Sequence, residues 1–194
     1  MAVIDYLERI LRQGSFQVGQ ITVSPGYIII HREDQSAEGL REYTDPHDAL
    51  EIARYDEAGK YRPLKTAANL RRGWRLTLRD ARETLMALDF LYPAALATIE
   101  ASSRGALPII PLRETLARQT GMYAVVKKIT DEQVGEVIQG LCRGEPKCLR
   151  AILWAGEAAT APEGGQQSLL CAEACNLFVA EGRKVVKKES VPAA

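Results

Sequence analysis

The sequence predicts an α+β protein, in which a small strand-containing N-terminal subdomain packs on a mostly helical C-terminal subdomain with a four-cysteine cluster site. Two apolar, β-branched runs, Gln20–Val23 and Tyr27–His31, are separated by the turn sequence Ser24-Pro25-Gly26. This pattern is typical of two strands joined by a tight connection. From about residue 77 to 140, apolar side chains recur at helical spacing instead.

The chain changes character over residues 56–75, where a turn sequence is followed by a dense run of basic residues. We therefore expect two domains, 1–75 and 76–190. Residues 123–129 have the β-branched content of a strand. Apolar periodicity, capping residues and stop signals predict helices over residues 2–12, 45–55, 79–92, 93–105, 111–119, 130–140 and 172–187.

The composition is that of an ordinary globular protein, with 46% hydrophobic and 26% charged residues in a chain of 194. There is no apolar stretch of about 18 residues and no signal-peptide pattern at the N-terminus, so we expect a cytoplasmic protein that does not bind a membrane. The 25 basic and 25 acidic side chains balance, which argues against nucleic acid as the main partner.

The cysteines carry the strongest chemical signal. Cys142, Cys148, Cys171 and Cys175 all lie in the C-terminal third, where clustered cysteines of a cytoplasmic protein indicate metal ligands. Four thiolates suit either zinc or an iron–sulfur cluster. The five-residue gap between the first two is wide for a zinc knuckle and favours a [4Fe–4S] cluster, although zinc, or four reduced thiols in a small core, stay open. Nearby basic residues would offset the negative charge of a tetrathiolate cluster: Arg143, Lys147 and Arg150.

Basic residues also gather at two other places in the sequence. An arginine side chain can bind a carboxylate or a phosphate with two parallel hydrogen bonds, so these residues are candidates for binding a polycarboxylate such as a tetrapyrrole, a phosphate, or a nucleic acid backbone. A solvated surface and an ordinary helix with its cap are the alternatives. The candidate ligand-binding residues are Arg62, Lys65, Arg71 and Arg72 in the first stretch, and Arg113 and Arg118 in the second.

The histidines and the known catalytic motifs give no acid–base pair. His31 and His47 have no partner at a metal-binding or catalytic spacing, so we expect each to lie at the surface or in a loop. A phosphate-binding loop, a nucleophile elbow and a zinc-protease motif are absent from the sequence. Whether the chain is an enzyme is left open.

Four segments together resemble a known bacterial family: Leu64–Trp74, Tyr92–Ala95, Pro111–Tyr123 and Cys171–Asn176. They are similar to the iron–sulfur region found fused behind sirohydrochlorin cobaltochelatase-like (CbiX-type) domains, and also found alone. The resemblance covers about residues 16–185. It implies a stabilising domain followed by a [4Fe–4S]-binding domain whose ligands correspond to the four cysteines.

These observations favour a [4Fe–4S] protein that transfers electrons or senses redox state, as an accessory of tetrapyrrole or cobalamin metabolism. Its partner would be a redox protein or a chelatase-like protein. The alternative is a non-catalytic binding module in which an iron–sulfur cluster or a zinc ion only clamps the fold.

Overall fold

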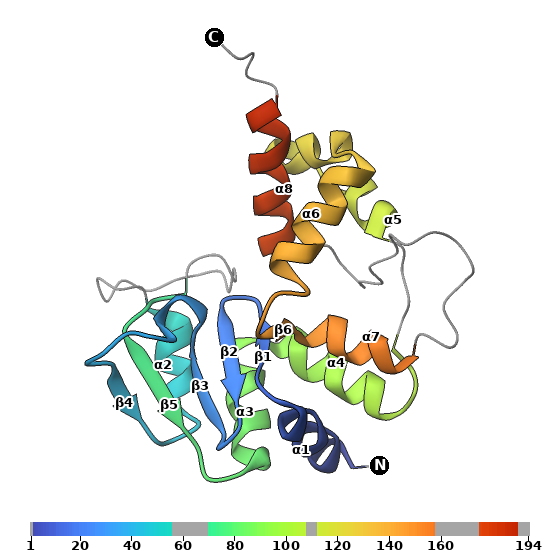
Figure 1. Ribbon diagram of the computed structural model, residues 1–194. Helices are drawn as coiled ribbons and strands as arrows, with labels where there is room; N and C mark the ends of the chain where they lie inside the picture. The colour runs from blue at the N-terminus through green and yellow to red at the C-terminus, as the bar shows by residue number, and fades with distance from the viewer. Residues whose placement is uncertain (1, 56–69, 108–111, 158–174, 190–194) are drawn as a thin grey trace. The chain divides into compact units, whose positions relative to one another are not determined.

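The computed structural model describes residues 2–55, 70–107, 112–157 and 175–189 (Figure 1). Its contacts divide the chain into two compact units, Met1–Leu107 and Pro108–Ala194. The predicted division after residue 75 falls inside a strand, β5 (Trp74–Thr77), which pairs with two strands of the first unit. The prediction of an α+β fold is confirmed.

The first unit is built on a mixed sheet. Its strands are β1 (Phe16–Val18), β2 (Ile21–Ser24), β3 (Ile28–His31), β4 (Arg41–Tyr43) and β5, and they lie in the order β4-β5-β3-β2-β1. β4 runs parallel to β5, and the other neighbours are antiparallel. The predicted pair of strands is β2 and β3, whose register joins Ser24 to Ile28. Between them Gly26 has a φ of 79°, a conformation that glycine adopts without strain.

Helices cover this sheet, and their apolar faces form the core. α1 (Val3–Gln13) contacts α3 (Ala81–Leu91) and α4 (Pro93–Ser103), while α2 (Asp48–Arg54) contacts α3 (Figure 1). α3 begins where the carboxylate of its N-cap residue, Asp80, accepts a hydrogen bond from the backbone N–H of Glu83. The largest fully buried side chains of the unit include Leu7, Phe16, Ile29, Ile52, Trp74, Leu76, Leu88 and Ile99.

The surface prediction for His31 is wrong, because this side chain is only 2% exposed. His31 ends β3, is paired with Ile21 of β2, and is followed at once by the short helix η1 (Arg32–Asp34). Its Nδ1 accepts a hydrogen bond from the backbone N–H of Glu33, and its Nε2 has no hydrogen-bond partner among the residues that the structure describes. Burial lowers the pKa of His31 below its ordinary value of 6.5. His47 is exposed, as predicted.

The second unit is helical in its described parts. It contains α5 (Leu112–Ala117), η3 (Gly121–Lys128), α6 (Asp131–Leu141), the two-residue strand β6 (Lys147–Cys148), α7 (Leu149–Glu157) and α8 (Asn176–Glu189). At the start of α6, in the predicted helix 130–140, Thr130 and Gln133 form a capping box. The residues that form the unit's buried hydrophobic cluster are Leu112, Leu116, Val126, Ile129, Val134, Val137, Ile138, Cys142, Phe178, Val179 and Val186.

The strand predicted at residues 123–129 is wrong, because this segment belongs largely to the 3₁₀ helix η3. Val126 and Ile129 are both buried, and a separation of three residues places them on the same side of a 3₁₀ helix. Packing against α8 and α5 thus outweighs the β propensity of the segment. Of the helices within the described ranges, none combines the length and apolar character needed to cross a membrane.

Candidate metal centre

Cys142 lies at the C-terminal end of α6, in the core of the second unit. Its backbone N–H donates to the carbonyl of Ile138 at 2.9 Å, as the last residue of a helix does. The side chain is 4% exposed and belongs to the hydrophobic cluster. The helix therefore delivers this thiol to an apolar, water-poor environment.

The segment between Cys142 and Cys148 is a tight loop. The backbone N–H of Cys148 donates to the carbonyl of Cys142 at 3.0 Å, and that of Arg143 donates to Ile138 at 3.1 Å. Gly144 allows the chain to turn back closely, because a Cβ at this position would lie 3.0 Å from the carbonyl oxygen of Gly140. These contacts hold the loop against the last turn of α6 and fix the backbone positions of both cysteines.

Cys175 immediately precedes α8. Its Sγ accepts a hydrogen bond from the backbone N–H of Phe178 at 3.3 Å, and its carbonyl accepts one from Val179 at 3.0 Å. The sulfur thus occupies the place of an N-capping oxygen. The partial positive charge at a helix N-terminus favours a thiolate over a neutral thiol.

Three of the four predicted ligands belong to or pack against the same hydrophobic cluster. Cys142 is part of the hydrophobic cluster, and Cys148 and Cys175 pack against it while remaining partly exposed. None of the three forms a disulfide with another described residue. Cys171 lies outside the described residues. Soft thiolates in apolar surroundings are the donors that iron–sulfur clusters and structural zinc require, so the donor set fits such a centre.

A tight mononuclear site is not formed by the described residues. Within the parts of the chain that the structure describes, no group of three or more Cys, His, Asp or Glu side chains is arranged to hold a metal ion. What the three cysteines share is contact with one hydrophobic cluster, from the end of α6, from β6 and from the residue before α8.

The predicted ligand-binding arginines that the structure describes each contact a carboxylate. In the first unit, Arg71 donates to Glu51 at 3.0 Å and to the Tyr43 hydroxyl at 2.8 Å. Arg72 forms an ion pair with Glu33 at 2.8 Å. Their neighbours in the predicted set, Arg62 and Lys65, lie outside the described residues.

The two predicted arginines of the second unit are paired as well. Arg113 binds the carboxylate of Asp131 and donates to the carbonyl of Ile129 at 2.7 Å, so it ties α5 to the start of α6. Arg118 approaches Glu114 at 3.7 Å within and just after α5. These contacts give Arg113 a structural role, and its function in ligand binding stays a prediction.

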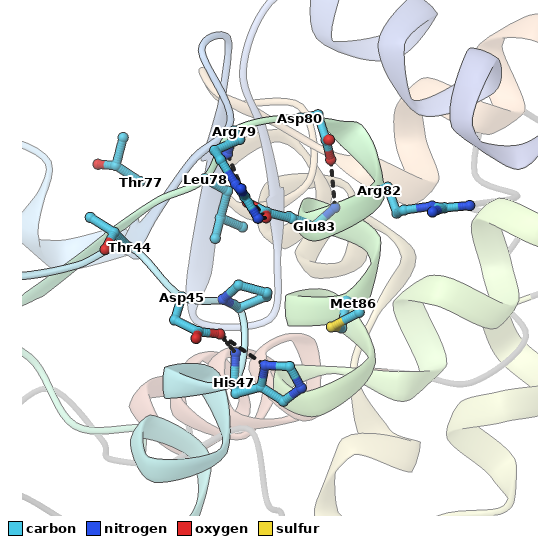
Figure 2. Close-up of a pocket in the computed structure, with 11 residues that line it drawn as sticks. Thr44, Asp45, His47, Thr77, Leu78, Arg79, Asp80, Arg82, Glu83 and Met86 are labelled. Atoms are coloured by element: carbon cyan, nitrogen blue, oxygen red, sulfur yellow. Dashed lines mark hydrogen bonds and ion pairs between the residues drawn. The ribbon is translucent and has the colours of Figure 1, made fainter.

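The first unit also contains a pocket of about 920 Å³, with several charged side chains in its lining, that was not predicted from the sequence (Figure 2). It lies where two parallel strands end: the segment Thr44–His47 follows β4, and Leu78–Asp80 follows β5. The carboxyl ends of parallel strands are common places for ligand sites. The parallel pairing of β4 and β5, which brings the two segments together, was not predicted from the sequence.

Ion pairs and hydrogen bonds occupy most of the charged groups in this pocket (Figure 2). Hydrogen bonds from the backbone and the ring of His47, the latter at 2.8 Å, lower the pKa of Asp45. A side-chain hydrogen bond from Arg79 lowers the pKa of Glu83, and the same contact raises the pKa of Arg79. The pocket is therefore held together by internal pairs.

Comparison with known families identifies the class of protein to which this arrangement belongs. Residues 104–184 match the 4Fe-4S iron-sulfur cluster binding domain, a range that contains all four cysteines. Residues 5–103 match the DR2241 stabilising domain. The matches meet four residues before the division between the two compact units at Leu107.

The chain belongs to the DR2241 stabilising-domain family, and carries the 4Fe–4S cluster binding domain behind it. The resemblance expected from the sequence motifs is thereby confirmed. A comparison with curated proteins gives no match.

One solved structure is similar over almost the whole chain. It is DR2241 from Deinococcus radiodurans, described as a multi-domain protein with structural similarity to chelatases but also with two additional novel domains. The two sequences are 29% identical, and the match covers 96% of this chain and 41% of that one, with a TM-score of 0.47. The chain thus spans about two fifths of that protein's length.

Proposed function

We propose that this chain is a cytoplasmic [4Fe–4S] protein that transfers electrons or senses redox state. Its proposed cluster ligands are Cys142, Cys148, Cys171 and Cys175. One observation carries the proposal: three of these cysteines come from separate elements, and each belongs to or packs against one hydrophobic cluster, inside the region that matches a 4Fe–4S binding domain. A bound cluster would supply a site that accepts and releases single electrons.

The surrounding residues have roles that suit such a centre. The apolar side chains next to Cys142 exclude water, and exclusion of water is one of the factors that set a cluster's reduction potential. The Phe178 N–H stabilises negative charge on the sulfur of Cys175. The closed loop between Cys142 and Cys148 holds two ligands at a fixed backbone spacing.

The family match favours iron–sulfur over zinc. The wide spacing between Cys142 and Cys148 also supports this choice, since zinc knuckles place their cysteines two to four residues apart, as a rough rule. The proposed connection to tetrapyrrole or cobalamin metabolism is the further expectation that the family resemblance implies.

The alternative is a purely structural role for the same site. It is favoured by the position of Cys142 within the core, since a metal centre there would clamp α6 to α8. Metal binding and folding are then one process, and losing a ligand unfolds the unit.

Replacement of one ligand distinguishes the two roles. We expect Cys175→Ser to lose the visible absorbance that a reductant bleaches and air restores, while far-UV circular dichroism stays close to that of the wild-type protein. The matched control is Val185→Ser, which places a hydroxyl at another partly buried position beside the same cluster and should retain the absorbance. Unfolding of Cys175→Ser, with Val185→Ser folded, would support the structural role instead.

A further inference from the structure

One face of α8 is strongly basic. Arg183 and Lys187 are four residues apart, and so are Lys184 and Lys188, so the four side chains form a continuous stripe along the second half of the helix. Glu181, which forms an ion pair with Lys184 at 2.8 Å, leaves the stripe with a net positive charge. In a chain whose formal net charge is zero, this is a local concentration of charge.

The stripe lies opposite the buried side of the helix. Phe178, Val179 and Val186 point into the hydrophobic cluster of the second unit. Gly182 lies so close to the end of η3 that a Cβ there would be 3.2 Å from the Cδ1 of Ile129, the residue that follows η3. Because the apolar face is already covered by protein, α8 cannot insert that face into a membrane surface.

Two exposed hydrophobic side chains adjoin the stripe. Met122 and Tyr123, at the start of η3, are 63% and 45% exposed. The guanidinium of Arg183 contacts the sulfur of Met122 at 3.7 Å, which joins the two elements into one surface. Methionine, tyrosine and arginine are enriched where proteins bind one another, whereas a surface that contacts only phosphate groups needs no such apolar residues.

We propose that this surface, formed by Met122, Tyr123, Arg183, Lys184, Lys187 and Lys188, binds the acidic face of an electron-transfer protein. The proposal rests on the proposed redox function. Opposite charges steer such encounters and raise the rate of association, and the two apolar side chains would supply the contact.

The position of the surface suits electron transfer to the proposed cluster. Cys175 caps the N-terminus of α8, and Arg183 lies about 12 Å further along the helix axis at 1.5 Å per residue. Lysines at the end of a helix also stabilise its dipole, and that effect alone would explain Lys187 and Lys188. It does not explain Met122 and Tyr123, which lie on a different element.

The test measures binding of a plant-type [2Fe–2S] ferredoxin, a small acidic electron carrier, by titration calorimetry. The first variant is Lys184→Gln/Lys187→Gln/Lys188→Gln. Its control removes the same charge from exposed positions elsewhere, in Arg12→Gln/Arg54→Gln/Arg104→Gln. We expect the dissociation constant to rise about tenfold in the first variant and less than about twofold in the control, with the difference lost at about 1 M salt.

A second variant tests the apolar part of the surface. Met122→Ala/Tyr123→Ala should weaken binding while the dependence on salt stays that of the wild-type chain. Absence of binding by the wild-type chain, equal effects of the two charge variants, or tighter binding to a DNA duplex or to phosphatidylserine vesicles would overturn the proposal. Iron is measured on the same samples. Binding of ferredoxin by a chain that contains no iron would refute the redox function and support the binding surface. A chain that contains iron but does not bind ferredoxin would refute the binding surface and leave the redox function supported.

Discussion

Replacement of Cys142 by alanine separates a cluster ligand from an ordinary core residue. The side chain is 4% exposed among aliphatic and aromatic neighbours. Removing its sulfur costs about 0.8 kcal/mol in transfer free energy, if sulfur is treated like a methylene group. The cavity of roughly 20 Å³ adds about 0.5 kcal/mol at about 24 cal/mol per Å³.

In protein stripped of metal by a chelator, Cys142→Ala should therefore lower the free energy of unfolding by about 1.3 kcal/mol. Cys148→Ala, at a partly exposed position, should cost less in this state. In protein purified without oxygen both variants should lose much more stability, because each removes one ligand and with it the stability that the cluster provides, while the difference between the two variants should stay the same.

Urea denaturation followed by far-UV circular dichroism measures both states. The reasoning fails if Cys142→Ala costs the same with and without chelator treatment. That result would mean that Cys142 only fills space in the core.

Three further predictions concern the fold. The free energy of unfolding should fall between about pH 7.5 and 5.5, because below a pKa of 6.5 His31 takes up a proton in the unfolded chain but not when it is buried in the folded one. His31→Gln should make this fall smaller. An unchanged pH dependence in urea titrations would contradict this. Thr130→Ala should lower the free energy of unfolding by about 1 kcal/mol, because it removes the capping box. Thr120→Ala, at an N-cap without a side-chain hydrogen bond, should lower it little. Equal urea midpoints for the two variants would refute the stabilising role of the capping box. Asp34→Ala should lower the free energy of unfolding by about 1–3 kcal/mol, measured by thermal or urea unfolding, since it removes the hydrogen bond that the Gly73 N–H donates to the Asp34 carboxylate at 2.7 Å, and Asp34→Asn should recover part of that loss.

Local signals predicted much of the fold. The turn around Gly26 and the capping box at Thr130 are encoded within a few residues, and the structure has both. The segment at residues 123–129 misled the prediction, because its β-branched residues favour a strand and only packing against α8 selects the 3₁₀ helix. The burial of His31 likewise depends on its partner in β2, which no local pattern reveals.

The candidate metal centre also combines features that local sequence predicts with features that depend on long-range packing. The proximity of Cys142 and Cys148 could be predicted from their spacing alone, because they border one short loop. The arrival of Cys175 at the same hydrophobic cluster depends on how α8 packs, which is a long-range property. The pocket after β4 and β5 could not be predicted, since a three-residue strand such as β4 has too little sequence to show a period.

Analysis of iron, acid-labile sulfide and zinc on protein purified without oxygen tests the central claim most directly. The account predicts about four irons and about four sulfides per chain, with little zinc. One zinc per chain in a colourless protein, without iron or sulfide, would contradict it.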